Sequence, residues 1–205
     1  MKNIVAIDVG NSETTVGVGN NLSWRSYRYT TRKTITSDEL FMMFKTTIDP
    51  ESINNENLDG SIICSVVPQI TESVVEATER FTSKKVYTVG PGIKTGLKVN
   101  IDNPKELGPD RIANSVGGFK MAQKSVIIVD LGTATTFDVV NDKKEYLGGS
   151  IAPGIKISLE ALTTKTSSLK SVEILSPKSA IGKNTYEAIQ SLSLIHISEP
   201  TRPDE

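Results

Sequence analysis

The sequence predicts an α/β protein with two similar domains, and three observations support this prediction. Short apolar segments of strand length alternate with segments of helical period. An apolar strand followed by Asp-x-Gly and threonines occurs twice, and its aspartates are Asp8 and Asp130. The chain of 205 residues also lies between the usual sizes of one and two domains. We expect the first domain to span residues 1–117 and the second to span residues 118–191.

The first half of the chain predicts three strands followed by alternating helices and strands. Short apolar or β-branched runs predict strands over residues 4–7, 14–18, 24–30, 61–67 and 85–89. One helix is expected to begin after Ser37, which has the side chain of an N-cap. Another is expected from Pro68 to Phe81, where apolar residues recur with helical period. Three antiparallel strands followed by this alternation predict a layer built like ribonuclease H.

The second half predicts the same organisation again. A helix is expected over residues 107–122, strands over 126–140 and 145–151, and a further helix through Leu162. The segment GPGIKTG at residues 90–96 looks like a phosphate loop, but its lysine and threonine precede the last glycine. Pro91 also lacks the backbone N–H that such a loop needs. We therefore interpret this segment as a connecting loop.

Composition excludes several classes of function. Lys and Arg together number 23 against 24 Asp and Glu, which predicts no basic surface for nucleic acid or an anionic membrane. No apolar run approaches the roughly 18 residues of a membrane span, and the first apolar run is too short for a signal peptide. We therefore expect a cytoplasmic protein. Cys64, the only cysteine, lies in an apolar run and is expected to be a buried core thiol.

The repeated segment has the chemistry of a phosphate-binding hairpin. Gly10 and Gly132 allow a ligand to approach the backbone closely. Hydroxyls that can donate to phosphate oxygens come from Ser12, Thr14, Thr133 and Thr135. Asp8 and Asp130 repel phosphate and therefore need a cation between them and the ligand. One such turn favours a structural role, whereas two matched copies predict a nucleotide phosphate clamp across a cleft between domains.

This arrangement resembles the superfamily of acetate and sugar kinases, Hsp70 and actin. Five segments narrow the resemblance, namely DVGNSETTVGV, ELGPDRIANSVGG, DLGTATTFD, GGSIAPGI and IGKNTYEAIQS. In this order they resemble the type III pantothenate kinases over residues 1–191. The resemblance implies two ribonuclease H-like domains with facing phosphate-binding hairpins. It also implies transfer of the ATP γ-phosphoryl group to the primary hydroxyl of pantothenate, which gives 4′-phosphopantothenate in the first step of coenzyme A biosynthesis.

The resemblance further implies roles for individual residues and a homodimeric, magnesium-dependent enzyme. The ATP contacts would be Asp8, Val9, Gly10, Asn11, Ser12, Glu13, Thr14, Thr15 and Thr133. The pantothenate contacts would be Gly108, Pro109, Asp110, Arg111 and Thr185. Asp110 would accept the hydroxyl proton, and Asp130 would hold the potassium or ammonium ion that the family requires.

Several of these assignments have structural alternatives. Asp110 could serve only as the N-cap of a helix that starts at Arg111. The planar fork of Arg111 fits either the pantothenate carboxylate or a phosphate. Pro109 and Ile101 depart from the family, which often has a small residue and a pocket-lining tyrosine at these places.

Two other functions and one unusual segment complete the expectations. The same fold could serve an ATP-binding regulator without kinase activity, or a sugar kinase with a different substrate segment.

The final segment LSLIHISEPTRPDE, residues 192–205, lacks helical period and resembles translated sequencing-adapter DNA. We therefore expect a non-native tail and an incomplete second domain.

Overall fold

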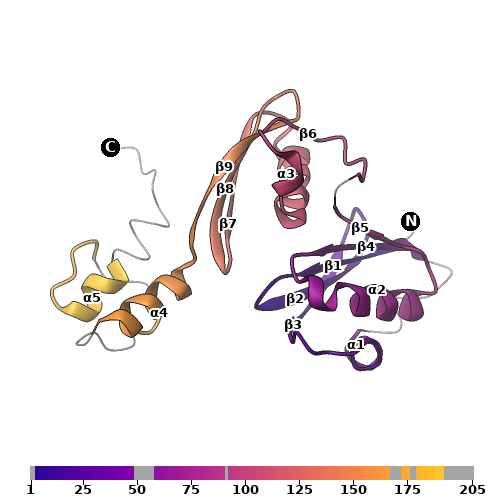
Figure 1. Ribbon diagram of the computed structural model, residues 1–205, viewed down its shortest axis with the longest axis horizontal. Coiled ribbons are helices and arrows are strands. Elements are labelled where there is room, and N and C mark those ends of the chain that lie inside the picture. The colour runs from indigo at the N-terminus through magenta and orange to yellow at the C-terminus, as the bar shows by residue number, and fades with distance from the viewer. Residues whose placement is uncertain (1–2, 49–57, 91, 167–171, 176–178, 192–205) are drawn as a thin grey trace. The chain divides into compact units, whose positions relative to one another are not determined.

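The computed structural model of the chain describes residues 3–48, 58–90, 92–166, 172–175 and 179–191. It contains one sheet of five strands and one of four, together with helices (Figure 1), so the predicted α/β class is confirmed. The expectation for the tail at residues 192–205 lies outside the described residues.

The five-stranded sheet has the strand order β3-β2-β1-β4-β5. Its strands are β1 (Asn3–Val9), β2 (Glu13–Gly19), β3 (Trp24–Thr30), β4 (Leu58–Ser65) and β5 (Val86–Thr88). Strand β1 pairs antiparallel with β2 and parallel with β4. Each of the five strands predicted for this half is present. Strand β4 begins earlier than expected. It also ends earlier than expected, because Pro68 already opens the next helix.

Two helices cover the core of this sheet. Helix α2 (Pro68–Thr82) packs against β4, and helix α1 (Ser37–Thr47) packs against α2 (Figure 1). The core is made mostly of apolar side chains and includes Val9, Ile63 and Val74, none of which is measurably exposed. Burial of such side chains supplies the main driving force for folding, at about 25 cal/mol per Å² of apolar surface.

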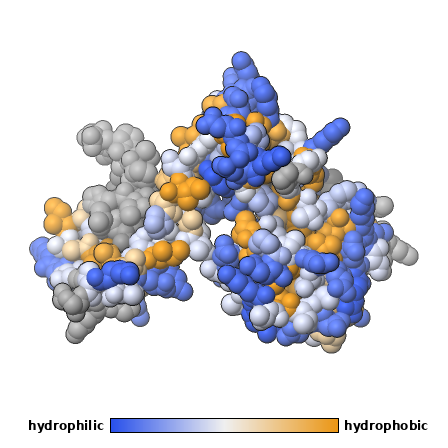
Figure 2. All heavy atoms as spheres, in the orientation of Figure 1, coloured by the Kyte–Doolittle hydropathy of each residue, from blue (hydrophilic) through white to orange (hydrophobic). Residues whose placement is uncertain are grey.

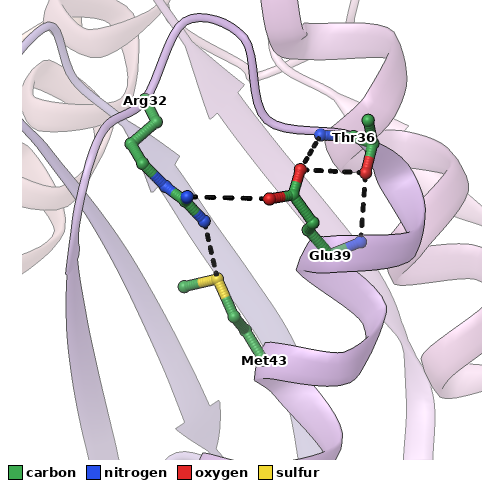
Figure 3. Close-up of polar contacts among 4 residues, drawn as sticks. All are labelled: Arg32, Thr36, Glu39 and Met43. Atoms are coloured by element: carbon green, nitrogen blue, oxygen red, sulfur yellow. Dashed lines mark hydrogen bonds and ion pairs between the residues drawn. The ribbon is translucent and has the colours of Figure 1, made fainter.

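Helix α1 begins with a capping box, and its cap is Thr36 (Figure 3). The Thr36 hydroxyl accepts from the backbone N–H of Glu39 at 3.2 Å, and the backbone N–H of Thr36 donates to the Glu39 carboxylate at 2.9 Å. Hydrogen bonds from Thr36 lower the pKa of Glu39, and Arg32 approaches the same carboxylate at 3.6 Å. The prediction of Ser37 as the cap is therefore wrong, because only Thr36 has a glutamate three residues later.

The four-stranded sheet has the order β6-β9-β8-β7. Its strands are β6 (Lys98–Val99), β7 (Val126–Leu131), β8 (Ala134–Val140) and β9 (Glu145–Pro153). The helices in this half are η2 (Pro104–Glu106), α3 (Pro109–Ala122), α4 (Ile155–Lys165) and α5 (Thr185–Gln190). Helix α3 starts two residues later than predicted, because Leu107 ends the short η2 turn and Gly108 caps α3.

The chain divides into two compact units. The first contains Met1–Ile127 and Val139–Gly148, and the second contains Ile128–Asp138 and Gly149–Glu205. On the face drawn in Figure 2, hydrophilic side chains cover much of the region around α1, α2 and β3, with apolar side chains between them. No helix among the described residues is both long enough and apolar enough to cross a bilayer. The predicted domain boundary at residues 117/118 stays a prediction.

The capping box of α1 provides a first test. Thr36→Ala removes the hydroxyl that accepts from Glu39, so the free energy of unfolding should fall by about 1 kcal/mol. Ser37→Ala is the matched control, because Ser37 is the first helical residue and not the cap. Urea denaturation of both variants measures the difference. Equal losses in the two variants would contradict the assignment of the cap to Thr36.

Candidate active site

The first hairpin turn, between β1 and β2, is held by hydrogen bonds within the first unit. The Gly10 N–H donates to the Glu13 carbonyl at 2.9 Å. The Thr31 hydroxyl donates to the Gly10 carbonyl at 2.8 Å, and it also lies 2.8 Å from the Thr14 hydroxyl. A Cβ at Gly10 would lie 3.0 Å from the Glu13 carbonyl oxygen, which explains why a glycine occupies this turn.

The side chains of this turn divide into exposed and buried groups. Asn11, Ser12 and Glu13 are exposed, which leaves them accessible to a ligand. Val9 and Thr14 are buried, so Val9 belongs to the core and the Thr14 hydroxyl serves the contact with Thr31. If Val9 and Thr14 contact phosphate, as the sequence predicts, they do so through their backbone atoms and not through their side chains.

Asp8 lies near the carboxyl end of β1, where the parallel strand β4 also ends. In register it stands beside Thr15 of β2 and Cys64 of β4. Its side chain is exposed, whereas the apolar residues before and after it, Ile7 and Val9, are buried. The carboxyl ends of parallel strands are where α/β proteins commonly bind ligands.

Cys64 lies within electrostatic range of two acidic side chains. Its side chain is buried, which confirms the predicted core thiol. Burial raises the pKa of the Cys64 thiol to about 12, and the negative charges of Asp8 and Asp110 add to the increase. The thiol also forms a hydrogen bond with Asp8, in which the protonated sulfur donates to the carboxylate. Asp8 from β1 and Asp110 from α3 therefore both act electrostatically on the same thiol.

Helix α3 presents Asp110 and Arg111 from its first turn. Gly108 is the N-cap and Pro109 the first helical residue, so the alternative in which Asp110 caps a helix starting at Arg111 is wrong. The Asp110 carboxylate accepts from the Arg111 backbone N–H at 2.8 Å. A Cβ at residue 108 would lie 2.5 Å from the Asp110 carboxylate oxygen, so glycine leaves the space that this carboxylate occupies.

Arg111 contacts an aromatic side chain from a distant part of the sequence. Its guanidinium carbon lies over the ring of Tyr146, 5.8 Å from the ring centre. Arg111 is half-buried, whereas Tyr146 is 1% exposed. Nearby on β9, a Cβ at Gly148 would lie 4.0 Å from the Ile101 side chain, which places Ile101 beside β9.

The second hairpin turn, between β7 and β8, is built within the second unit and is tighter than the first. The Gly132 N–H donates to the Ala134 carbonyl at 3.0 Å, so this hydrogen bond joins residues two positions apart. The corresponding hydrogen bond of the first turn joins Gly10 and Glu13, which are three positions apart. The Gly154 N–H donates to the Thr133 carbonyl at 3.1 Å. A Cβ at Gly154 would lie 2.4 Å from the carbonyl oxygens of Gly132 and Thr133, so only glycine fits against this turn.

Asp130 lies beside the second hairpin turn. Its carboxylate oxygen lies 3.6 Å from the position that a Cβ at Gly132 would occupy, close to the carbonyl-rich turn. Within the part of the chain that the structure describes, no three His, Cys, Asp or Glu side chains gather as a metal-binding cluster. A carboxylate oxygen is a ligand type that suits a hard cation.

The remaining predicted site residues differ in exposure. Thr133 is exposed on the second turn, and Thr185 is the exposed first residue of α5, which Asn184 caps. Thr135 is only 1% exposed and therefore does not offer its hydroxyl to a ligand as predicted. Sequence reasoning missed the contacts of Tyr146 with Arg111 and of Gly154 with Thr133, because the partners lie far apart in the sequence.

The fold has been seen before in a solved structure. A conserved protein of Campylobacter jejuni, assigned to the Baf family of transcriptional activators, aligns with a TM-score of 0.54 at 17% identity. The alignment covers 91% of this chain and 72% of that one. Together with the two Asp-x-Gly hairpins, this similarity defines the class as a mixed α/β protein with two sheets.

The chain belongs to the type III pantothenate kinase family. The sequence pattern of that family matches residues 4–195. The type III pantothenate kinase of Syntrophotalea carbinolica is 42% identical over 190 residues, and that of Geotalea uraniireducens is 44% identical over 189 residues. Each alignment covers 92% of this chain and 74% of the relative.

The neighbourhood of Cys64 gives a test of the first-unit site. Only the thiolate is alkylated, so iodoacetamide should modify Cys64 much more slowly than an ordinary thiol at about pH 8.5. Asp110→Asn removes one of the charges that raise this pKa, so the thiolate fraction and the alkylation rate should rise several-fold.

The matched control for alkylation is Asp102→Asn, because Asp102 does not contribute to the pKa shift of Cys64. Its rate should equal that of the wild type. Equal rates in the wild type and Asp110→Asn would show that Asp110 does not lie near the thiol.

Proposed function

We propose that this protein transfers the γ-phosphoryl group of ATP to the primary hydroxyl of pantothenate. The product is 4′-phosphopantothenate, and the reaction is the first step of coenzyme A biosynthesis. The observation that supports this most strongly is the family match over residues 4–195, which contains all five motifs. The influence of both Asp8 and Asp110 on the pKa of Cys64 agrees with it, because these two acids come from the nucleotide motif and the substrate motif.

Asp110 is the proton acceptor in this proposal. Phosphoryl transfer depends mainly on positioning and charge neutralisation, with an aspartate that accepts the proton of the attacking alcohol. Asp110 is suited to this role because it lies in the first turn of α3, where the absence of a side chain at Gly108 leaves it room. Arg111 follows directly and binds the pantothenate carboxylate, while Thr185 adds a substrate contact.

The two hairpin turns bind ATP in this proposal. The backbone of residues 8–15 and Thr133 supply donors for the phosphate oxygens. Asp8 would hold a magnesium ion, and Asp130 would hold a potassium or ammonium ion. When bound, these cations neutralise phosphate charge. The proposed frame is a pair of ribonuclease H-like domains with facing hairpins and a boundary near residues 117/118.

The proposal also covers the localisation, the oligomeric state and the partners of the enzyme. We propose a cytoplasmic homodimer that binds neither nucleic acid nor membrane, in line with the balanced charge of 23 basic and 24 acidic residues. The alternative of a regulator without kinase activity is not favoured, because the curated relatives at 42% and 44% identity are named as kinases. The similarity to the Baf family protein, at 17% identity, concerns the fold alone.

A coupled assay for ADP release tests the function and the role of Asp110 together. With ATP, magnesium and potassium, ADP release by the wild type should depend on pantothenate. Asp110→Asn should lower kcat by about 10²–10⁴, the usual contribution of a positioned acid or base. The melting temperature and the KM for ATP should change little, because asparagine has nearly the same shape.

Asp102→Asn is the control for this assay and should keep the wild-type kcat. ADP release that is independent of pantothenate would reject the proposed function. Pantothenate-dependent turnover that is unchanged in a folded Asp110→Asn variant would reject only the role of Asp110.

Asp130 predicts a dependence on monovalent cations. Replacing potassium with sodium should reduce kcat, because the larger and more weakly hydrated ion fits a site of carboxylate and carbonyl oxygens. Asp130→Asn should remove most of the activation by potassium, whereas Asp142→Asn, at an exposed turn, should keep it. Initial rates over a potassium titration measure both effects. Equal rates in potassium and sodium would contradict the assignment.

A further inference from the structure

Strand β3 forms one edge of the five-stranded sheet. Among the strands that the structure describes, its only neighbour is β2, with which it pairs antiparallel. Just before β3, the Asn20 N–H donates to the Ser23 carbonyl at 3.0 Å. Just after it, the Thr31 N–H donates to the Ser12 carbonyl, also at 3.0 Å. Both hydrogen bonds continue the register of the β2–β3 pairing, so they fix which residues of β3 bond to β2.

Every second residue of β3 directs its backbone away from β2. In an antiparallel pair, hydrogen-bonded residue pairs alternate with pairs that are not hydrogen-bonded. Counting in twos from the bonded residues Ser23 and Thr31, the N–H and C=O groups of the residues between the bonded ones point to the free edge. These outward-facing residues are Trp24, Ser26, Arg28 and Thr30, and all four are exposed. A row of such groups can pair with one further strand.

The side chains of the same four residues lie on the face of the sheet that helix α1 does not cover. A Cβ at Gly17 of β2 would lie 3.3 Å from the Trp24 ring, so this ring rests on β2. Tyr29, of the opposite parity, turns to the other face, where its ring lies 6.2 Å from that of Phe44 in α1. Trp24 is 51% exposed and therefore offers apolar surface beside the free edge.

The edge is also positively charged. Residues 14–37 contain four basic side chains and no Asp or Glu, although the whole chain has a formal charge of −1. The four are Arg25, Arg28, Arg32 and Lys33. By the alternation of a strand, Arg25 and Arg28 lie on opposite faces of β3. A strand added at this edge would therefore meet an arginine on either face.

This charge selects among the possible partners. Pairing of two copies of β3 would bring their arginines together, and like charges on neighbouring strands destabilise a sheet. Charged side chains on an edge strand thus oppose self-association. An acidic strand would instead be attracted by the same arginines, and complementary charge favours the encounter of two such partners.

We propose that the free edge of β3 is a docking surface for an extended acidic peptide. The peptide adds a sixth strand to the sheet, with its backbone bonded to the outward-facing residues of β3 and its carboxylates beside Arg25 and Arg28. The exposed part of the Trp24 ring provides an apolar contact next to these charges. The proposed phosphoryl transfer uses none of these residues, so this inference does not depend on it.

The fluorescence of Trp24, the only tryptophan, reports binding at this edge of the full chain. The probe is a capped peptide of seven residues, the length of β3, that repeats valine, glutamate, glutamate and so carries acid on both faces. Its addition should shift the emission of Trp24, with an affinity that falls as salt is raised. The same peptide with every backbone nitrogen methylated cannot donate to β3, so its Kd should be at least about tenfold higher.

Two charge reversals test the role of the arginines. Arg28→Glu places an acid at the edge and should raise the Kd for the acidic peptide at least about tenfold. Lys124→Glu makes the same change of charge at an exposed position outside β3 and should alter the Kd less than about twofold. Circular dichroism melts should show both variants folded, and both should keep the pantothenate-dependent ADP release of the wild type.

Several results would overturn the docking surface. One is no shift of Trp24 emission at about 1 mM peptide, the weak limit of specific binding. Others are equal affinity for the methylated peptide, for a peptide with lysine in place of glutamate, or in Arg28→Glu. Tighter binding of a seven-nucleotide single strand of thymidines would assign the edge to nucleic acid and reject the peptide. These outcomes leave the proposed function intact, because only the ADP assay tests it.

Discussion

The parallel pairing of β1 with β4 is the constraint on which the first-unit site depends. These strands are 49 or more residues apart in the chain, yet their register places Asp8 beside Cys64 and Val9 beside Ser65. The next residue, Val66, donates its N–H to the Val9 carbonyl at 3.0 Å, which fixes the point where the two strands end. A shift by one residue would turn every side chain of β1 to the other face, so the burial of Val5, Ile7 and Val9 specifies this register.

Electrostatics explains how Asp8 and Asp110 affect both the Cys64 thiol and a bound phosphate. A thiol beside two carboxylates stays protonated, because ionising it would add a third negative charge to a partly buried place. Phosphate groups carry the same sign of charge and would be repelled for the same reason. Donors from the hairpin backbone, cations and the Arg111 fork therefore have to accompany the phosphates. In the proposed function these groups neutralise charge, and Asp110 accepts the proton of the substrate hydroxyl.

Local sequence patterns predicted most of the secondary structure and part of the site. Apolar periodicity located the strands and helices, because burial on one face imposes that periodicity. The cap of α1 was misplaced by one residue, since serine and threonine are both good caps and only the glutamate at Glu39 distinguishes them. Three features of the site depend on residues far apart in the chain. They are the contact of the buried Thr14 with Thr31, the contact of Tyr146 with Arg111 and the packing of Gly154 on the second turn. No local pattern encodes such contacts.

Ligand protection of Cys64 tests most directly whether the acids that raise the pKa of this thiol belong to the site where ATP and pantothenate react. The chain has a single cysteine, so mass spectrometry after iodoacetamide treatment reports one position. If the account is right, magnesium–ATP together with pantothenate will slow alkylation of Cys64 at concentrations that saturate turnover, because the ligands cover the end of β4. An alkylation rate that is the same with and without these ligands, under conditions of full turnover, would contradict it.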